Sequence, residues 1–114
     1  MGFGLHPANV ASGSVTVPAA GTTSDGLFIA GASLIGLITP SALDSTGLTF
    51  EVSTDGSTWY PLYDRNGTQV SLSVTTGAAY SLDPEWLAPW EWIRIVCGTT
   101  ETAARTFQLI GRAL

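Results

Sequence analysis

The sequence has little positive charge: it contains no lysine, and its cationic residues are four arginines against nine acidic residues. The net charge is −5 at neutral pH. Because phosphate groups are bound mainly by cationic side chains, we expect neither nucleic-acid binding nor attraction to an anionic membrane. Charged residues of both signs make up only 11% of the chain, so Ser, Thr, Gly and apolar side chains must cover much of the surface. Such a surface is typical of a Ser/Thr-faced β-protein or of a protein that packs against a partner.

The residues that most often build metal and catalytic sites are also scarce. With one cysteine, Cys97, and one histidine, His6, the chain can form neither an internal disulfide nor a zinc site of cysteines and histidines. Cys97 ends the apolar run WIRIVC, where we expect a buried side chain. The carboxylates are scattered singly, and the sequence has no GxSxG, P-loop or HExxH motif. We therefore expect no enzyme activity, no catalytic residue, no cofactor and no bound metal.

Long hydrophobic runs are absent as well. The first residues, MGFGLHPANV, lack the positively charged start and the apolar core of a secretory signal. The apolar stretch LFIAGASLIGLI is about a dozen residues long and is interrupted by glycine, so it is too short to span a bilayer. We expect a protein that is made in the cytoplasm and acts outside the secretory route.

Period-two alternation of apolar and polar residues dominates the rest of the chain. In LTFEVS, for example, Leu48, Phe50 and Val52 alternate with polar residues, as in a strand with one buried face. Comparable segments recur between turn residues: GSVTVP, SLIGLIT, LTFEVS, TWYPLY, TQVSLSV, AAYSL, EWIRIVC and TFQLIG. About eight strands at this spacing predict an all-β protein, an antiparallel β-sandwich of jelly-roll type. We expect one domain over residues 14–114, preceded by an N-terminal arm of residues 1–13.

Two of these segments contain a residue that restricts their place in the fold. Pro61 removes a backbone donor from TWYPLY, so this strand lies at a sheet edge or contains a bulge. Arg94 interrupts the otherwise apolar EWIRIVC, and it needs either a partner or a route to water.

Two acidic tetrapeptides, TDGS with Asp55 and DRNG with Asp64, admit two interpretations. Asp-Gly and Asn-Gly supply the positive φ angles that tight hairpin turns need. The alternative is that the carboxylates bind a metal or a sugar. A calcium loop needs several oxygen ligands close together in the sequence, and neither tetrapeptide has them. We predict turns that connect consecutive strands.

The N-terminal arm, MGFGLHPANVASG, mixes glycine with two large apolar residues, Phe3 and Leu5, and with the only histidine, His6. One interpretation is a frayed terminus. The other is an arm that lies on a neighbouring subunit, with Phe3 and Leu5 as its anchors.

A tryptophan-rich segment, SLDPEWLAPWEWIRI, places Trp86, Trp90 and Trp92 close together in the sequence. Asp83 followed by Pro84 is typical of a helix start, so DPEWLAPW predicts one short helical turn at an end of the sandwich. The indoles either close that end, form a protein contact, or offer a surface on which a sugar stacks. The sequence alone leaves all three roles open.

Three stretches, GLTFEVSTDGSTWYPLYDRNG, YSLDPEWLAPWEWIRIVCG and ARTFQLIGRAL, resemble small β-sandwich proteins from the structural gene clusters of tailed phages. Over roughly residues 48–114 the chain looks like a head decoration, or cement, protein of jelly-roll type. FEVSTDGSTWYPLY and WIRI are also similar to discoidin-like modules, although the chain lacks the signal peptide and cysteine pair of secreted lectins.

The decoration-protein resemblance implies a structural virion protein that binds and stabilises the outer surface of a phage capsid. Its partner would be the major capsid protein, and it would act as a homo-oligomer, commonly a trimer around local threefold positions. The resemblance supplies no contact residues. Those that we expect from the residues themselves are Phe3, Leu5, His6, Trp86, Trp90 and Trp92.

The alternative function is a carbohydrate-binding or adhesion module of a phage tail or baseplate. A sugar-binding protein needs an indole face that is exposed in the folded chain, whereas a cement protein can bury all of its tryptophans at core or subunit contacts.

Overall fold

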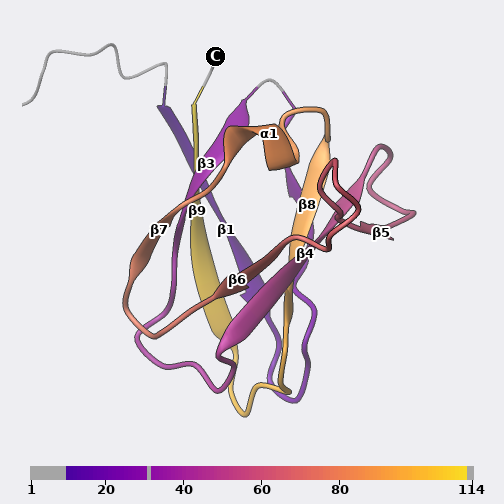
Figure 1. Ribbon diagram of the computed structural model, residues 1–114. Coiled ribbons are helices and arrows are strands. Elements are labelled where there is room, and N and C mark those ends of the chain that lie inside the picture. The colour runs from indigo at the N-terminus through magenta and orange to yellow at the C-terminus, as the bar shows by residue number, and fades with distance from the viewer. Residues whose placement is uncertain (1–9, 31, 113–114) are drawn as a thin grey trace, which may run out of the picture.

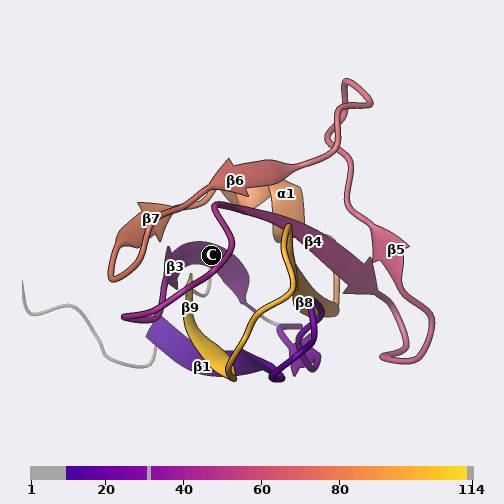
Figure 2. The ribbon, with the colours of Figure 1, turned by 90° about the horizontal axis from the view of Figure 1, so that it is seen from below.

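The computed structural model describes residues 10–30 and 32–112, which form a β-sandwich of two antiparallel sheets (Figure 1). In the first sheet, the strand order is β1 (Val10–Val17), β9 (Arg105–Arg112), β3 (Ser33–Ile38) and β7 (Ala79–Ser81). The second sheet contains β2 (Leu27–Phe28), β8 (Trp92–Cys97) and β4 (Gly47–Ser53), with β5 (Tyr60–Pro61) and β6 (Ser71–Ser73) both paired to β4. Figure 2, which looks along the strands, separates the two layers.

Two short strands, β5 and β6, act as one interrupted strand because they pair with opposite ends of β4. When they are counted together the sandwich has the order β1-β9-β3-β7 facing β2-β8-β4-β5/β6. This is the order of a jelly roll. The all-β, jelly-roll-like sandwich expected from the sequence is therefore confirmed. Pro61 lies on β5 at a sheet edge, which is one of the two places expected for it, the other being a bulge.

The core lies between the sheets and consists of the alternating apolar residues of each strand. Phe50 of β4, Ile95 of β8, and Phe107 and Leu109 of β9 belong to one buried cluster, and all four have at most 1% of their surface exposed. Cys97 belongs to this core as a buried, free thiol, as expected, and burial raises the pKa of that thiol. The polar residues between these positions point away from the core, which is why the period-two pattern indicated the fold.

The first strand begins earlier than the sequence indicated. Residues 10–13, assigned to the N-terminal arm, pair with β9, from Val10 opposite Arg112 to Gly13 opposite Leu109. The segment lacks apolar alternation because Gly13 faces the core at a point where Leu27 leaves almost no room for a side chain. A backbone ladder needs no apolar side chain, so the pattern missed it. The N-terminal arm expected from the sequence therefore excludes residues 10–13. Its remaining residues, 1–9, include Phe3, Leu5 and His6 and lie outside the described residues.

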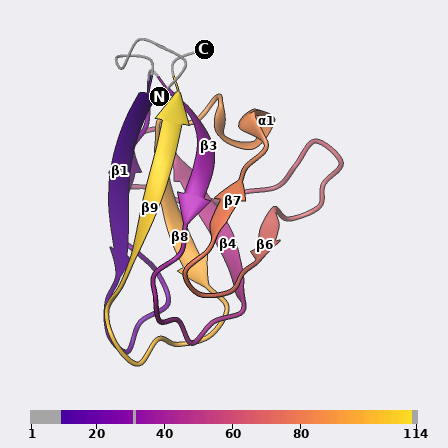
Figure 3. The same cartoon turned by 90° about the vertical axis from the view of Figure 1, so that its left-hand side faces the viewer.

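The predicted helical turn is α1 (Pro84–Leu87), which lies at one end of the sandwich (Figure 3). Asp83 is its N-cap and accepts a hydrogen bond from the N–H of Glu85, while Pro84 occupies the first turn, where a backbone donor is not needed. Leu87 anchors the helix in the core with 0% exposure. Within residues 10–30 and 32–112, no helix has the length and apolar character needed to cross a bilayer.

Candidate functional site

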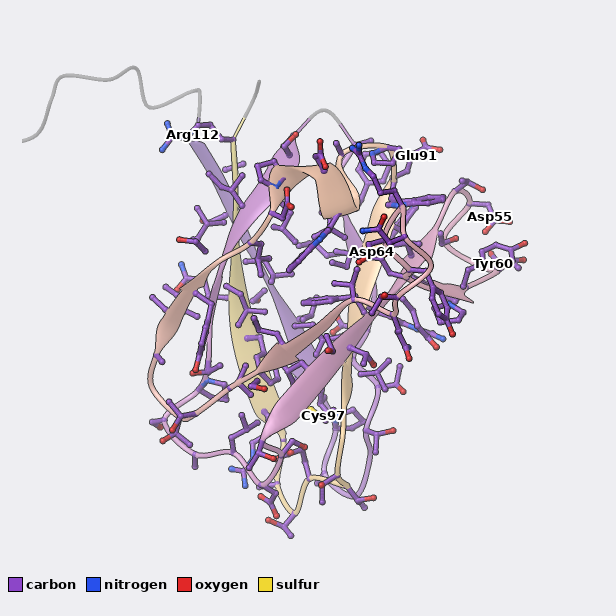
Figure 4. The ribbon with its side chains drawn as sticks, in the orientation of Figure 1. Asp55, Tyr60, Asp64, Glu91, Cys97 and Arg112 are labelled. Carbon is purple, nitrogen blue, oxygen red and sulfur yellow. The ribbon has the colours of Figure 1, made fainter. Side chains whose placement is uncertain are left out.

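The two acidic tetrapeptides are turns. One carboxylate oxygen of Asp55 accepts hydrogen bonds from the N–H groups of Ser57 and Thr58, at 2.8 and 2.9 Å, and Gly56 has a φ of +78°. These bonds, that from Thr58 foremost, lower the pKa of Asp55. In the second turn, Asp64 accepts from the N–H groups of Asn66 and Thr68. Figure 4 shows Asp55 and Asp64 on separate loops. In the described part of the chain, no three His, Cys, Asp or Glu side chains are close enough to hold a metal ion.

The three tryptophans of the SLDPEWLAPWEWIRI segment separate into two environments. Trp86 and Trp90, on α1 and just after it, are half-buried and pack against the core cluster. Trp92 begins β8 and lies on the outer face of the second sheet, where its ring meets Phe28 edge-on with centroids 5.2 Å apart. Trp92 therefore has different surroundings from Trp86 and Trp90.

An open groove lies between α1 and the hairpin of residues 62–70, with a volume of about 380 Å³. Tyr63, which is 53% exposed, lines it together with the partly buried indoles of Trp86 and Trp90. The guanidinium of Arg65 and the carboxylate of Glu85 meet across it at 2.9 Å, which links the hairpin to the helix. The remaining lining residues are Asp64, Asn66, Asp83 and Pro89.

Two carboxylates of this groove accept hydrogen bonds from backbone N–H groups of residues that follow them closely in the sequence. Asp64 accepts its hydrogen bonds through Oδ1, and so does Asp83 as the cap of α1. In the described chain these bonds use Oδ1 alone, so Oδ2 of each residue remains available to a ligand. The groove thus combines three aromatic rings with oxygen acceptors in fixed positions.

A second surface, which we call the β1–β2 side, lies where the edges of the two sheets meet. It consists of Ala11, Ser12 and Gly13 of β1, Leu27 and Phe28 of β2, and the following Ile29 and Ala30. These residues line a cavity of about 160 Å³ together with Ala32, Leu34, Leu109 and Gly111, and none of the lining residues is charged. Phe28 is 55% exposed at its mouth.

The edge of β1 on this side has backbone groups that face away from β9. The N–H of Thr16 donates to Asp25 at 2.7 Å, and the N–H of Asp25 donates back to the Thr16 carbonyl. Alternate residues of a strand direct their backbone groups to the same side, so those of Ser12 and Ser14 also point outward. No further strand of the described chain pairs with β1, which leaves an edge without charge or proline at residues 11–14.

The outer face of the second sheet holds the partner that Arg94 required. Its guanidinium contacts Glu51 at 2.6 Å and lies 4.4 Å from the ring centroid of Trp59. Glu51 thus neutralises the charge of Arg94 on the face of the sheet, and Trp59 covers the guanidinium.

Phe3, Leu5 and His6 lie outside the described residues. Among the other expected contacts, Trp86 and Trp90 share a site. Sequence reasoning missed Tyr63 and Arg65 in the groove and Phe28 on the β1–β2 side. Tyr63 precedes the turn of residues 64–67 and Arg65 lies within it, and the sequence of a turn does not show which distant element its side chains will face. Phe28 belongs to a two-residue strand that is too short to show alternation.

Comparisons with known proteins show a similarity of fold but no similarity of sequence to a known family. No family model and no curated protein matches the sequence. Among solved structures, the fold is similar to that of the SPBc2 prophage-derived protein YomS, with a TM-score of 0.55. Sequence identity is 14%, over 90% of this chain and 93% of that one. At this identity the likeness concerns the fold, so the chain is a small jelly-roll β-sandwich whose function must be argued from its own surfaces.

Proposed function

We propose that this chain is a structural phage protein that binds the outer surface of a capsid as a decoration, or cement, protein and catalyses no reaction. The observation that carries the proposal is the β1–β2 side, an uncharged surface with an exposed Phe28, a cavity and an edge of β1 with which no strand of residues 10–30 and 32–112 pairs. The phage origin of YomS, which shares the fold, supports the setting.

Charge distribution favours this side as the contact with the major capsid protein. The chain has a net charge of −5, yet none of the residues that line the cavity is acidic. A partner can therefore approach here without desolvating a carboxylate, which would cost several kcal/mol per buried, unpaired charge. The free edge of β1 adds main-chain donors and acceptors, which a partner strand can use.

Self-association fits the same role. In a decoration protein many copies bind one lattice, so each contact can be weak while the assembled array holds firmly. The expected homo-oligomer, with a trimer favoured, remains a proposal that the solution mass tests directly.

The test is cosedimentation with capsids of the phage that encodes the chain. Phe28→Lys places a charge at the mouth of the cavity, and we expect at least about tenfold weaker binding. Tyr60→Lys is the matched control, because Tyr60 is 56% exposed and lies on β5, at the opposite edge of the second sheet from β2. Equal binding by the two variants, or no binding by the unmodified protein, would contradict the proposal.

One observation favours the alternative, a carbohydrate-binding or adhesion module of a tail or baseplate. That function needs an accessible aromatic face, and the groove offers the exposed ring of Tyr63 beside the partly buried indoles of Trp86 and Trp90. The groove and the lining of the β1–β2 cavity share no residue, so the two functions can be tested separately.

A further inference from the structure

We propose that the groove between α1 and the 62–70 hairpin binds a neutral oligosaccharide. The proposal does not rest on capsid binding, because the groove lies apart from the β1–β2 side. The volume of about 380 Å³ is within the range of small-molecule sites. Three properties of the groove identify the ligand class: its aromatic rings, its fixed acceptors and its charge.

The aromatic rings match the apolar faces of pyranose rings. Tyr63 presents half of its surface to solvent, and Trp86 and Trp90 present the parts of their indoles that the core does not cover. Packing against the core holds both indoles in place, so a ligand does not have to order them. Rigid aromatic side chains provide contact area at a low cost in conformational entropy.

The acceptors match sugar hydroxyl groups. Asp64 and Asp83 line the groove and use Oδ1 in a turn and in a helix cap, which leaves Oδ2 of each residue for a ligand. The Asn66 amide adds both a donor and an acceptor. Hydrogen bonds between carboxylates and hydroxyls are stronger than neutral ones. Because the turn and the cap hold these groups before binding, less of the binding energy is lost to ordering them.

The charge of the groove selects a neutral ligand. Arg65 is its only cation and is paired with Glu85, so Asp64 and Asp83 remain as uncompensated negative charges among the lining residues. A uronic or sialic acid would be repelled, whereas a neutral saccharide would not. The Arg65–Glu85 pair is 75% and 68% exposed, so it is weakly held and can open to a ligand.

The protein is titrated with each of three tetrasaccharides, and binding is measured by tryptophan fluorescence and by calorimetry. Two are neutral, β-1,4-linked N-acetylglucosamine and β-1,4-linked glucose, and the third is the acidic tetragalacturonate. We expect at least one neutral probe to bind and to change the emission, because Trp86 and Trp90 line the groove. Tyr63→Ala should weaken that binding at least about tenfold. Tyr60→Ala, an equally exposed tyrosine outside the groove, should leave it unchanged.

A second variant tests the selection by charge. Asp83→Asn keeps a side chain that caps α1, so the helix stays formed while one negative charge is removed. We expect discrimination against tetragalacturonate to fall about threefold or more in this variant. Thermal unfolding of each variant confirms that it is folded.

Three results would overturn the proposal: no neutral probe binds at concentrations up to about 10 mM, Tyr63→Ala binds as well as the unmodified protein, or the acidic probe binds better than both neutral ones. Each of these leaves the capsid proposal intact, because that proposal depends on Phe28 and the Phe28→Lys variant.

Discussion

The carboxylate of Glu101, with no exposed surface, accepts a hydrogen bond from Nε of Arg105 at 2.9 Å. The same carboxylate accepts the N–H groups of Asp44 and Ser45 and the Ser45 hydroxyl, and Arg105 also reaches Asp44. Burial would raise the pKa of Glu101, but these donors outweigh it and lower the pKa from 4.5 to about 2. Since every contact is internal, we assign the cluster to stability rather than to ligand binding.

This cluster predicts a loss of stability in acid. The pKa of Glu101 is lower in the folded chain than in the unfolded chain, so its contribution is complete above pH 4.5. That contribution should be lost as the pH falls from 4.5 to about 2, because the unfolded chain then binds the proton more readily. Urea unfolding at successive pH values measures the change.

Glu101→Gln provides the control, since it keeps the shape of the side chain and removes the charge. We expect a loss of about 1–3 kcal/mol at pH 7 and a smaller dependence of stability on pH below 4.5. An acid dependence as steep as that of the unmodified protein would show that other carboxylates are responsible.

Two glycines with the same backbone conformation should respond differently to alanine. Gly56 and Gly67 have φ angles of +78° and +80°. A Cβ on Gly67 meets nothing within 4 Å, so Gly67→Ala should cost about 1 kcal/mol from the left-handed backbone alone. A Cβ on Gly56 would lie 3.0 Å from the Trp92 ring, so Gly56→Ala should cost at least about 2 kcal/mol. Equal unfolding free energies for the two variants would mean that Trp92 moves aside freely.

Arg94 and Arg65 form a second comparison. The Arg94–Glu51 pair is about a quarter exposed and stacks on Trp59, whereas the Arg65–Glu85 pair is mostly exposed. Arg94→Ala should therefore cost about 1–3 kcal/mol, and Arg65→Ala should cost less than about 1 kcal/mol. Chemical unfolding of both variants checks the order, and a larger loss for Arg65→Ala would reverse our interpretation of the two pairs.

Two truncations distinguish the contribution of residues 1–9 to stability from that of residues 10–13. Removal of residues 1–13 deletes half of β1, whose residues 10–13 pair with β9, so we expect a clear fall in the unfolding temperature. Removal of residues 1–9 keeps that ladder intact, and we expect an unfolding temperature within a few degrees of the full chain.

Light scattering on the full and shortened chains then tests self-association. A trimer that survives removal of residues 1–9 would assign the contacts to the described sandwich, and a trimer that is lost would assign them to the arm. A monomer in every form would contradict a preformed oligomer.

Local pattern was enough for most of the fold. Alternation around Phe50 and Ile95 identified two strands, Pro61 indicated either a sheet edge or a bulge, and Asp83-Pro84 identified the start of α1. Each of these signals acts within a few residues of the chain. The candidate site was predictable only in part, because Trp86 and Trp90 were singled out while Tyr63, from another hairpin, was not.

The sequence by itself determined that the chain folds as an all-β sandwich, low in charge, with turns at Asp55 and Asp64 and a short helix in its tryptophan-rich segment. Only the tertiary structure decided that Trp92 packs against Phe28 while Trp86 and Trp90 pack against the core. It also decided that β1 and β2 bring an uncharged edge, a cavity and Phe28 together. The reason is that turns, caps and strand faces depend on neighbours in sequence. Grooves and sheet edges depend on which distant strands pair, and the energy of that pairing is spread over the whole core.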